Sequence, residues 1–224
     1  IIINDFEPIT AWACKLRGGN IVSLSHQSSI AFEETPKPNE INFLGKFFLK
    51  YYAPIKEKFG FHFQSYLPKI FTPVIREKIR QLHPTMEDKV VVYLPAYSNE
   101  NIAQVLEGLP TNFKVFNIES KTAFQKGNCD FIPIDEKVFL QELRTCKGVL
   151  CGAGFELPSE SLFLQKKLFV IPIKKQLEQE YNAKALEEMG VAVAHELNAE
   201  KIKNWLLDER KVLVTYPNQN EEIM

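Results

Sequence analysis

Short apolar runs alternate with stretches of helical periodicity along most of this chain. Between residues 90 and 208, each apolar run is followed by a segment whose apolar side chains recur every three or four positions. This alternation is typical of a doubly wound α/β domain, in which helices cover both faces of a parallel sheet and ligands bind where strand ends meet helix starts. We expect strands at 90–94, 113–117, 130–132, 148–151, 168–171 and 191–194, and helices at 99–107, 137–145, 158–164, 179–189 and 199–208.

The chain begins with a smaller version of the same pattern. Apolar runs at 1–4 and 21–24 flank a helical segment that starts at Pro8 and stops at Gly18-Gly19. This order predicts a βαβ unit, whose parallel strands should be buried on both faces. Because the sequence opens on apolar residues without a starting Met, we expect it to be a fragment of a longer protein.

Residues 41–52 mix aromatic side chains with lysines and suggest an amphipathic helix. Its aromatic residues either pack in the core or touch a membrane surface. Two strands are expected next, at 61–66 and 69–75, with Pro73 near a strand end. The charged stretch 76–89 then breaks the pattern and indicates a domain boundary.

Composition excludes several classes of function. The 27 basic and 28 acidic residues are spread along the 224-residue chain, so no electrostatic footprint indicates a nucleic-acid partner. Four cysteines lack C-x-x-C spacing and no secretory pattern is present, which suits free thiols in the cytoplasm. No apolar run approaches the ~20 residues that a membrane-spanning helix needs, which leaves peripheral membrane association as the open alternative.

The strand at 148–151 runs directly into Gly152-Ala153-Gly154 and then into a helix. Backbone amides at such a helix start stabilise a phosphate group, although a tight turn that needs small residues gives the same pattern. Ser159 and Glu160 follow in that helix, where a carboxylate can accept both hydroxyls of a ribose. These residues predict a nucleotide site.

The next strand ends at Ile171-Pro172, and another helix start follows it. Glu178, Gln179 and Asn182 lie at this second helix start, and their carboxylate and amides suit the hydroxyl groups of a hexose. Glu178 also has a plainer explanation, because acidic residues complement the positive end of a helix.

Together the two segments resemble the donor-binding region of GT-B glycosyltransferases. The similarity is to bacterial enzymes like the peptidoglycan N-acetylglucosaminyltransferase and to families related to UDP-glucuronosyltransferases. It implies that Glu160 holds the ribose, that the turn from Gly152 to Phe155 approaches the diphosphate, and that Glu178 and Gln179, with Asn182, hold the donor sugar. The matching residues are Gly154-Phe-Glu-Leu-Pro-Ser-Glu160, Ile171-Pro172 and Glu178-Gln179-Glu-Tyr-Asn182-Ala183.

The resemblance also implies a domain plan. It consists of two Rossmann-like doubly wound parallel-sheet domains, of which the N-terminal one is truncated. We expect a partial acceptor-side domain at 1–80, a linker at 81–88, a donor-binding domain at 86–208 and a C-terminal tail at 209–224 that returns to the first domain or frays.

Further positions have weaker roles. The backbone near Ile134 would meet the base, and Tyr97 and Ser98 either contact phosphate or form a plain turn. In related enzymes an Asp matching Asp5 orients a catalytic histidine on a segment that this chain lacks, although Asp5 could simply cap the following helix. His26 is either an acceptor-side base or a structural histidine.

These features predict a hexosyltransferase that uses a nucleoside-diphosphate sugar and inverts the anomeric carbon. The family resemblance favours UDP as the nucleotide. No cofactor is implied, and no DxD-type acidic pair indicates a metal ion. The acceptor is not identified, and a lipid-linked or cell-envelope molecule is expected. Alternatives are a nucleotide-sugar epimerase or hydrolase on the same fold, or a non-catalytic nucleotide-sugar-binding module.

Overall fold

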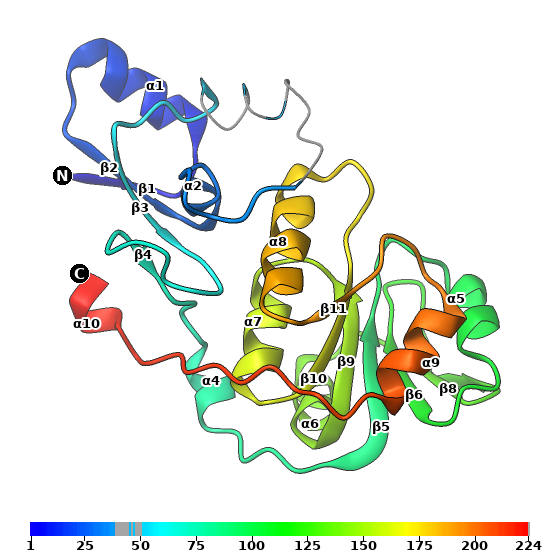
Figure 1. Cartoon of the computed structure of the whole chain (residues 1–224). Helices are drawn as coiled ribbons and strands as arrows, with labels where there is room; N and C mark the ends of the chain where they lie inside the picture. The colour runs from blue at the N-terminus through cyan, green and yellow to red at the C-terminus, as the bar shows by residue number, and fades with distance from the viewer. Residues whose placement is uncertain (39–44, 46, 48–50, 224) are drawn as a thin grey trace. The chain divides into compact units, whose positions relative to one another are not determined.

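A computed structural model describes residues 1–38, 45, 47 and 51–223 of the chain. Most of the helix predicted for 41–52, with its possible membrane-facing side chains, lies outside these residues. The chain forms two compact units, which Figure 1 shows coloured by residue number. The first unit consists of Ile1–Val74 with Tyr216–Met224, and the second unit consists of Ile75–Thr215.

The second unit contains a seven-stranded sheet in the order β11-β10-β9-β5-β6-β8-β7, parallel except for the antiparallel pair β7 and β8. Its order confirms the predicted doubly wound sheet. The strands are β5 (Glu87–Tyr93), β6 (Asn112–Phe116), β7 (Phe124–Lys126), β8 (Cys129–Ile132), β9 (Cys146–Gly152), β10 (Lys167–Ile171) and β11 (Ala192–Val193).

Helices cover both faces of this sheet (Figure 1), as right-handed crossovers between parallel strands require. The chain first moves from β5 to β6 in one direction and later from β9 to β10 and β11 in the other. The helices are α4 (Glu77–Arg80), α5 (Asn99–Leu106), α6 (Glu136–Thr145), α7 (Glu156–Phe163), α8 (Leu177–Glu188) and α9 (Ala199–Leu207). The crossover helices of the two series lie on opposite faces, with α5 on one face and α7 and α8 on the other. Helix α9 follows the last strand and packs on the same face as α5.

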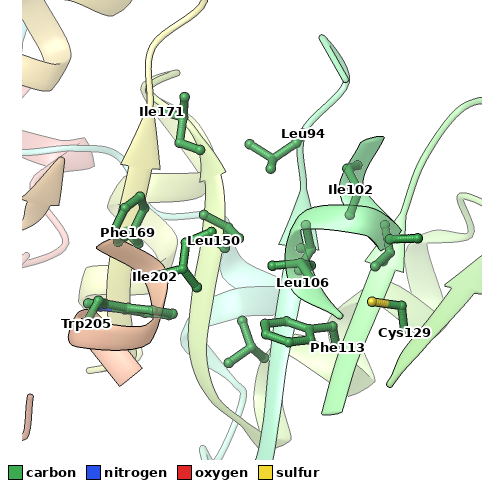
Figure 2. Close-up of a cluster of buried hydrophobic side chains, with 14 of the residues drawn as sticks. Leu94, Ile102, Leu106, Phe113, Cys129, Leu150, Phe169, Ile171, Ile202 and Trp205 are labelled. Carbon is green, nitrogen blue, oxygen red and sulfur yellow. The ribbon is translucent and has the colours of Figure 1, made fainter. Parts of the chain in front are cut away.

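One face of the sheet packs against α5 and α9 and forms the main hydrophobic core (Figure 2). Val92, Leu150 and Phe169 are register partners across three neighbouring strands and are almost fully buried. Trp205 of α9 meets Phe169 edge to face, with ring centroids 5.6 Å apart. A Cβ at Gly148 would lie 3.0 Å from the Trp205 ring, so a larger residue here would require the indole to shift away from β9.

The strand β7 was not predicted. It is three residues long, exposed throughout, and joined to β8 by a turn at Gly127, which has a φ of +58°. Because it pairs on one side only and buries no side chain, it lacks the apolar pattern that identifies the inner strands.

The first unit has a four-stranded parallel sheet in the order β1-β2-β3-β4. Glu7 caps α1 by accepting hydrogen bonds from the amides of Ile9 and Thr10, both at 2.7 Å, and Gly18 ends this helix with a φ of +72°. The elements are β1 (Ile2–Asn4), α1 (Pro8–Arg17), β2 (Ile21–Ser25), α2 (His26–Ser29), β3 (Glu57–Phe61), β4 (Ile70–Phe71) and α10 (Asn220–Ile223).

Two expectations for this unit were wrong. The first strand is not buried on both faces: Ile2 and Ile3 of β1 are 43% and 69% exposed, because β1 is an edge strand of the described sheet. The strands placed at 61–66 and 69–75 are β3 and β4, which are displaced or shorter. The apolar residues after Phe61 are buried as a loop at the end of β3, so burial in this segment did not mark a strand.

Residues after Thr215 pack with the first unit. The Tyr216 hydroxyl donates to the carbonyl of Phe63 at 3.1 Å, and the Thr72 hydroxyl donates to Gln219 Oε1 at 2.7 Å. The C-terminal tail therefore packs against the residues around Phe63 and Thr72 in the first unit. No helix in the described parts of the chain combines the length and apolar character needed to cross a membrane.

Lys166 is a buried cation at the amino end of β10. Its side chain is 4% exposed and donates to the carbonyls of Thr85, Arg144 and Cys146 at 2.8, 2.8 and 2.9 Å. Burial lowers its pKa. Two of these carbonyls lie at the carboxyl end of α6, so one ammonium group satisfies groups that the helix leaves unpaired.

Replacing Lys166 with Met should lower the free energy of unfolding by about 2–4 kcal/mol, because three carbonyls lose a charged donor in a buried place. Urea unfolding measures this loss. Lys201→Met, at an exposed position of α9, serves as control and should change stability by less than about 0.5 kcal/mol. Equal stability of the two variants would show that Lys166 does not hold this end of the sheet.

Candidate functional site

The order of strands in the second unit places the topological switch point at the carboxyl ends of β5 and β9. The chain leaves β5 toward β6 and later continues from β9 toward β10, so the direction of winding reverses between these two strands. Ligands of doubly wound sheets bind at this switch point. The segments that leave it are the turn from Gly152 to Phe155 after β9 and residues 94–98 after β5.

Two buried amide side chains hold the turn after β9. Gln179 Oε1 accepts hydrogen bonds from the amides of Ala153 at 3.2 Å and Ile173 at 2.9 Å. Asn182 Nδ2 donates to the carbonyl of Ala153 at 3.0 Å. Gln179 is 9% exposed and Asn182 is fully buried, so α8 fixes the turn from its inner side. A Cβ at Gly154 would meet no atom within 4 Å, which leaves open space beside the turn.

The helices that follow β9 and β10 begin differently from those that follow β5, β8 and β11. Among the described residues, Ser98, Asp135 and Asn198 cap α5, α6 and α9 with side-chain oxygens. No side chain caps α7 at Phe155 or α8 at Gln176. The first amides of α7 and α8 therefore keep the positive end of the helix dipole available for an anionic or hydroxyl-rich ligand.

Glu160 lies inside α7 and is 4% exposed. Arg76 pairs with it side-on: Nε lies 2.6 Å from Oε1 and Nη2 lies 2.9 Å from Oε2. The hydrogen bond with Glu160 raises the pKa of Arg76 above its usual value. Ser159, also buried, donates its hydroxyl to the carbonyl of Phe155 at 2.7 Å within the same helix.

The sequence interpretation missed Arg76, which it assigned to a charged boundary segment. Arg76 and Glu160 are separated by 84 residues, and neither local pattern points to the other. Ile75 and Ile79 are buried on either side of Arg76 and hold this segment in place. The only available signal was Glu160 itself, because a buried carboxylate needs a donor or a cation.

The remaining donor-side candidates lie where the sequence suggested, in ordinary structural surroundings. Ile134 is 53% exposed and follows the end of β8. Ser98 accepts from the amide of Asn101 at 3.3 Å as the cap of α5, and the carbonyl of Tyr97 accepts from Asn117 Nδ2 at 2.9 Å. Their roles in ligand binding remain predictions. The same holds for Glu178, which is half-buried in the first turn of α8.

In the first unit, the alternative in which Asp5 caps the following helix is wrong, because Glu7 provides that cap. Asp5 is exposed directly after β1. His26, 7% exposed, is the first residue of α2 directly after β2, and its Nδ1 lies 2.8 Å from the carbonyl of Phe61. A carbonyl only accepts, so Nδ1 carries the proton and Nε2 is the basic nitrogen of the neutral ring.

A second histidine lies beside His26, with ring centroids 5.6 Å apart. His62 is fully buried, and its Nδ1 accepts from the amide of Phe63 at 2.9 Å. Its Nε2 has no hydrogen-bond partner within the described part of the chain. Burial, together with the nearby charges of His26 and Lys37, lowers the pKa of His62 to about 3. This histidine is therefore neutral at physiological pH.

The doubly wound sheet defines an α/β protein whose switch point lies where ligands of such sheets bind. The family model for glycosyl transferase family 1 matches residues 1–208, so the chain belongs to this family. The α/β fold and its GT-B type, with two Rossmann-like parallel-sheet units, are thereby confirmed. A search of curated proteins gave no match to the chain.

Solved structures share the fold at low sequence identity. A UDP-glucosyltransferase from Polygonum tinctorium is 13% identical with a TM-score of 0.58, and the match covers 91% of this chain and 65% of that one. UGT2 of Phytolacca americana, complexed with UDP-2fluoro-glucose and pterostilbene, is 13% identical with a TM-score of 0.60, covering 91% and 66%. The spinosyn forosaminyltransferase SpnP is 10% identical with a TM-score of 0.54, covering 91% and 65%. The chain thus spans about two thirds of the length of these proteins.

Gln179→Ala should release the turn after β9, because the amides of Ala153 and Ile173 lose their shared acceptor. We expect a loss of about 1–3 kcal/mol in the free energy of unfolding and faster hydrogen exchange at these two amides. Gln176→Ala is the matched control, since Gln176 is exposed and caps nothing. Unchanged exchange in the Gln179 variant would contradict the assigned contacts.

His62 should make the first unit sensitive to acid. Its folded pKa of about 3 lies below its ordinary value of 6.5, so the unfolded chain binds the proton first. Stability should therefore fall by up to about 1.4 kcal/mol for each pH unit between about pH 6 and pH 3, and the His62 contribution should level off below that. Urea unfolding followed through amide signals of the first unit measures this slope, and His62→Phe should flatten it. An unchanged slope in the variant would assign the acid sensitivity to other groups.

Proposed function

We propose that the second unit is the donor site of a hexosyltransferase that uses a nucleoside-diphosphate sugar, with UDP as the nucleotide. The observation that carries this proposal is the meeting of the turn from Gly152 to Phe155, Gln179 and Asn182 at the switch point of a family 1 fold. The Phytolacca neighbour, complexed with UDP-2fluoro-glucose, agrees with this choice of nucleotide.

The diphosphate is proposed to bind beside Gly154. The space there is open, and the start of α7 presents backbone amides without a capping side chain. Amides fixed in this way need no reorganisation when negative charge develops on the leaving diphosphate. The helix thus supplies the positive potential that a metal ion supplies elsewhere.

Glu160 is proposed to bind the ribose, and Glu178, Gln179 and Asn182 the hexose. A carboxylate can accept from both ribose hydroxyls. Gln179 uses its oxygen on the backbone of the turn and of the loop after β10, so its Nε2 is the atom proposed to face a sugar hydroxyl. Asn182 would act on the sugar indirectly, by fixing the carbonyl of Ala153.

The reaction is proposed to invert the anomeric carbon by direct displacement, with a base that activates the acceptor hydroxyl. Within this chain His26, directly after β2, is the candidate base. Asp5 is exposed and able to orient a basic side chain. The acceptor, a lipid-linked character for it, peripheral membrane contact and a cytoplasmic location remain predictions from the sequence.

Calorimetry with UDP, GDP, dTDP and 2′-deoxy-UDP tests this proposal. Wild type should bind UDP best among the diphosphates and discriminate against 2′-deoxy-UDP by about tenfold, the worth of one hydrogen bond to a charged group. Glu160→Ala should weaken UDP binding by about 10–100-fold and abolish that discrimination. Glu188→Ala, at the exposed end of α8, is the control and should bind like wild type.

Equal binding by wild type and Glu160→Ala would remove Glu160 from the ribose site. Failure of wild type to bind any nucleotide would contradict the pocket as a whole. When a UDP-sugar is supplied with candidate acceptors, release of free sugar would indicate a hydrolase, a changed sugar configuration would indicate an epimerase, and binding without turnover would indicate a binding module.

A further inference from the structure

Arg76 occupies the carboxylate that the proposed function assigns to a ribose. Its guanidinium takes both oxygens of Glu160 side-on, with contacts of 2.6 and 2.9 Å. The side chain of Glu160 is only 5% exposed, whereas that of Arg76 is 47% exposed. Arg76 is therefore the outer partner of this pair.

The segment that carries Arg76 is anchored against α7. Ile75 and Ile79 are buried, and the Arg80 guanidinium lies 5.1 Å from the ring centroid of Phe163 at the end of α7. With its backbone held in this way, Arg76 is presented to Glu160 in the ligand-free protein.

A ribose and Arg76 would both bind the two carboxylate oxygens of Glu160. The two hydroxyls of a ribose engage a carboxylate most directly through both oxygens, along the edge that a side-on guanidinium already fills. With Glu160 almost fully covered, both sets of donors cannot approach this edge together. One of them has to leave.

We propose that Arg76 is a residue of the donor site that closes the ribose subsite in the ligand-free protein, so that a ribonucleotide binds by displacing it from Glu160. This inference rests on the proposed function of Glu160. Arg76 keeps a buried carboxylate paired while the site is empty, because an unpaired carboxylate at this depth is unfavourable.

Glu136 offers Arg76 a second carboxylate partner when it is displaced from Glu160. Arg76 Nη1 already lies 3.3 Å from Glu136 Oε1, and the side chain of Glu136 is 55% exposed. Lys78 shares this carboxylate at 2.7 Å. After displacement, the positive charge of Arg76 is therefore still paired with the carboxylate of Glu136. The guanidinium remains near the site without covering Glu160.

Uridine and UDP binding to Arg76→Ala tests the proposal, because the nucleoside has the ribose but no phosphate. If Arg76 holds the site closed most of the time, removing it should tighten both ligands by about three- to tenfold. Arg76→Lys, which keeps the charge but loses the fork, should lie between this variant and wild type. Lys78→Ala is the matched control, since Lys78 shares Glu136 but does not touch Glu160; it should bind like wild type.

Two results would overturn the proposal while leaving the donor site intact. Unchanged binding of both ligands by Arg76→Ala would show that the pair does not compete with ribose. Weaker binding of UDP with unchanged uridine would make Arg76 a phosphate ligand instead. If wild type and all variants bind neither ligand, the proposed function fails together with this inference.

A measurement on wild type covers the case in which Arg76→Ala fails to fold. The Nε proton of Arg76 should exchange slowly with water in the free protein, because it is bonded to a buried carboxylate. Saturating UDP should accelerate this exchange, observed by NMR of the arginine side chains. Protection that persists with UDP bound would contradict displacement.

Discussion

One side-chain oxygen, Gln179 Oε1, joins the two loops that leave neighbouring strands of the second unit. It accepts from Ala153 after β9 and from Ile173 after β10. Parallel strands end at the same edge of a sheet, so their loops bring unpaired amides together where no ladder can satisfy them. A single buried acceptor from α8 resolves this, and Asn182 completes it on the carbonyl side. The shape of the candidate donor site depends on these contacts.

A side chain satisfies the carboxyl end of α6, whereas the starts of α7 and α8 have no side-chain cap in the described part of the chain. At the amino end of β10, buried Lys166 closes the carboxyl end of α6 through backbone carbonyls. At the opposite edge, α7 and α8 begin without side-chain caps within the described residues. Because helix ends are polar, the satisfied end of α6 favours stability and the uncapped starts of α7 and α8 favour a ligand. Glu160 of α7 forms a charge pair with Arg76. In the proposed complex, neutral ribose hydroxyls would replace the guanidinium in this pair.

The fold of the second unit was predictable because inner parallel strands are buried on both faces. Runs such as 90–94 and 168–171 are apolar without interruption, and no other local structure explains them as simply. Edge strands lack this constraint. β7 is exposed throughout and escaped prediction, whereas β1 was recognised as a strand and wrongly expected to be buried. In the loop after β3, buried aromatic residues produced an apolar sequence pattern like that of a strand.

The sequence by itself determined the α/β class, the glycine turn after β9 and the polar residues at the starts of α7 and α8. These follow from patterns within a few neighbouring residues, where backbone geometry limits the choices. Only the tertiary structure decided what those polar groups touch. It turned Gln179 toward the backbone, gave the cap of α1 to Glu7 and not Asp5, and paired Glu160 with a residue 84 positions away. Side chains far apart in sequence meet only through the packing of the whole unit, and no local pattern records that meeting.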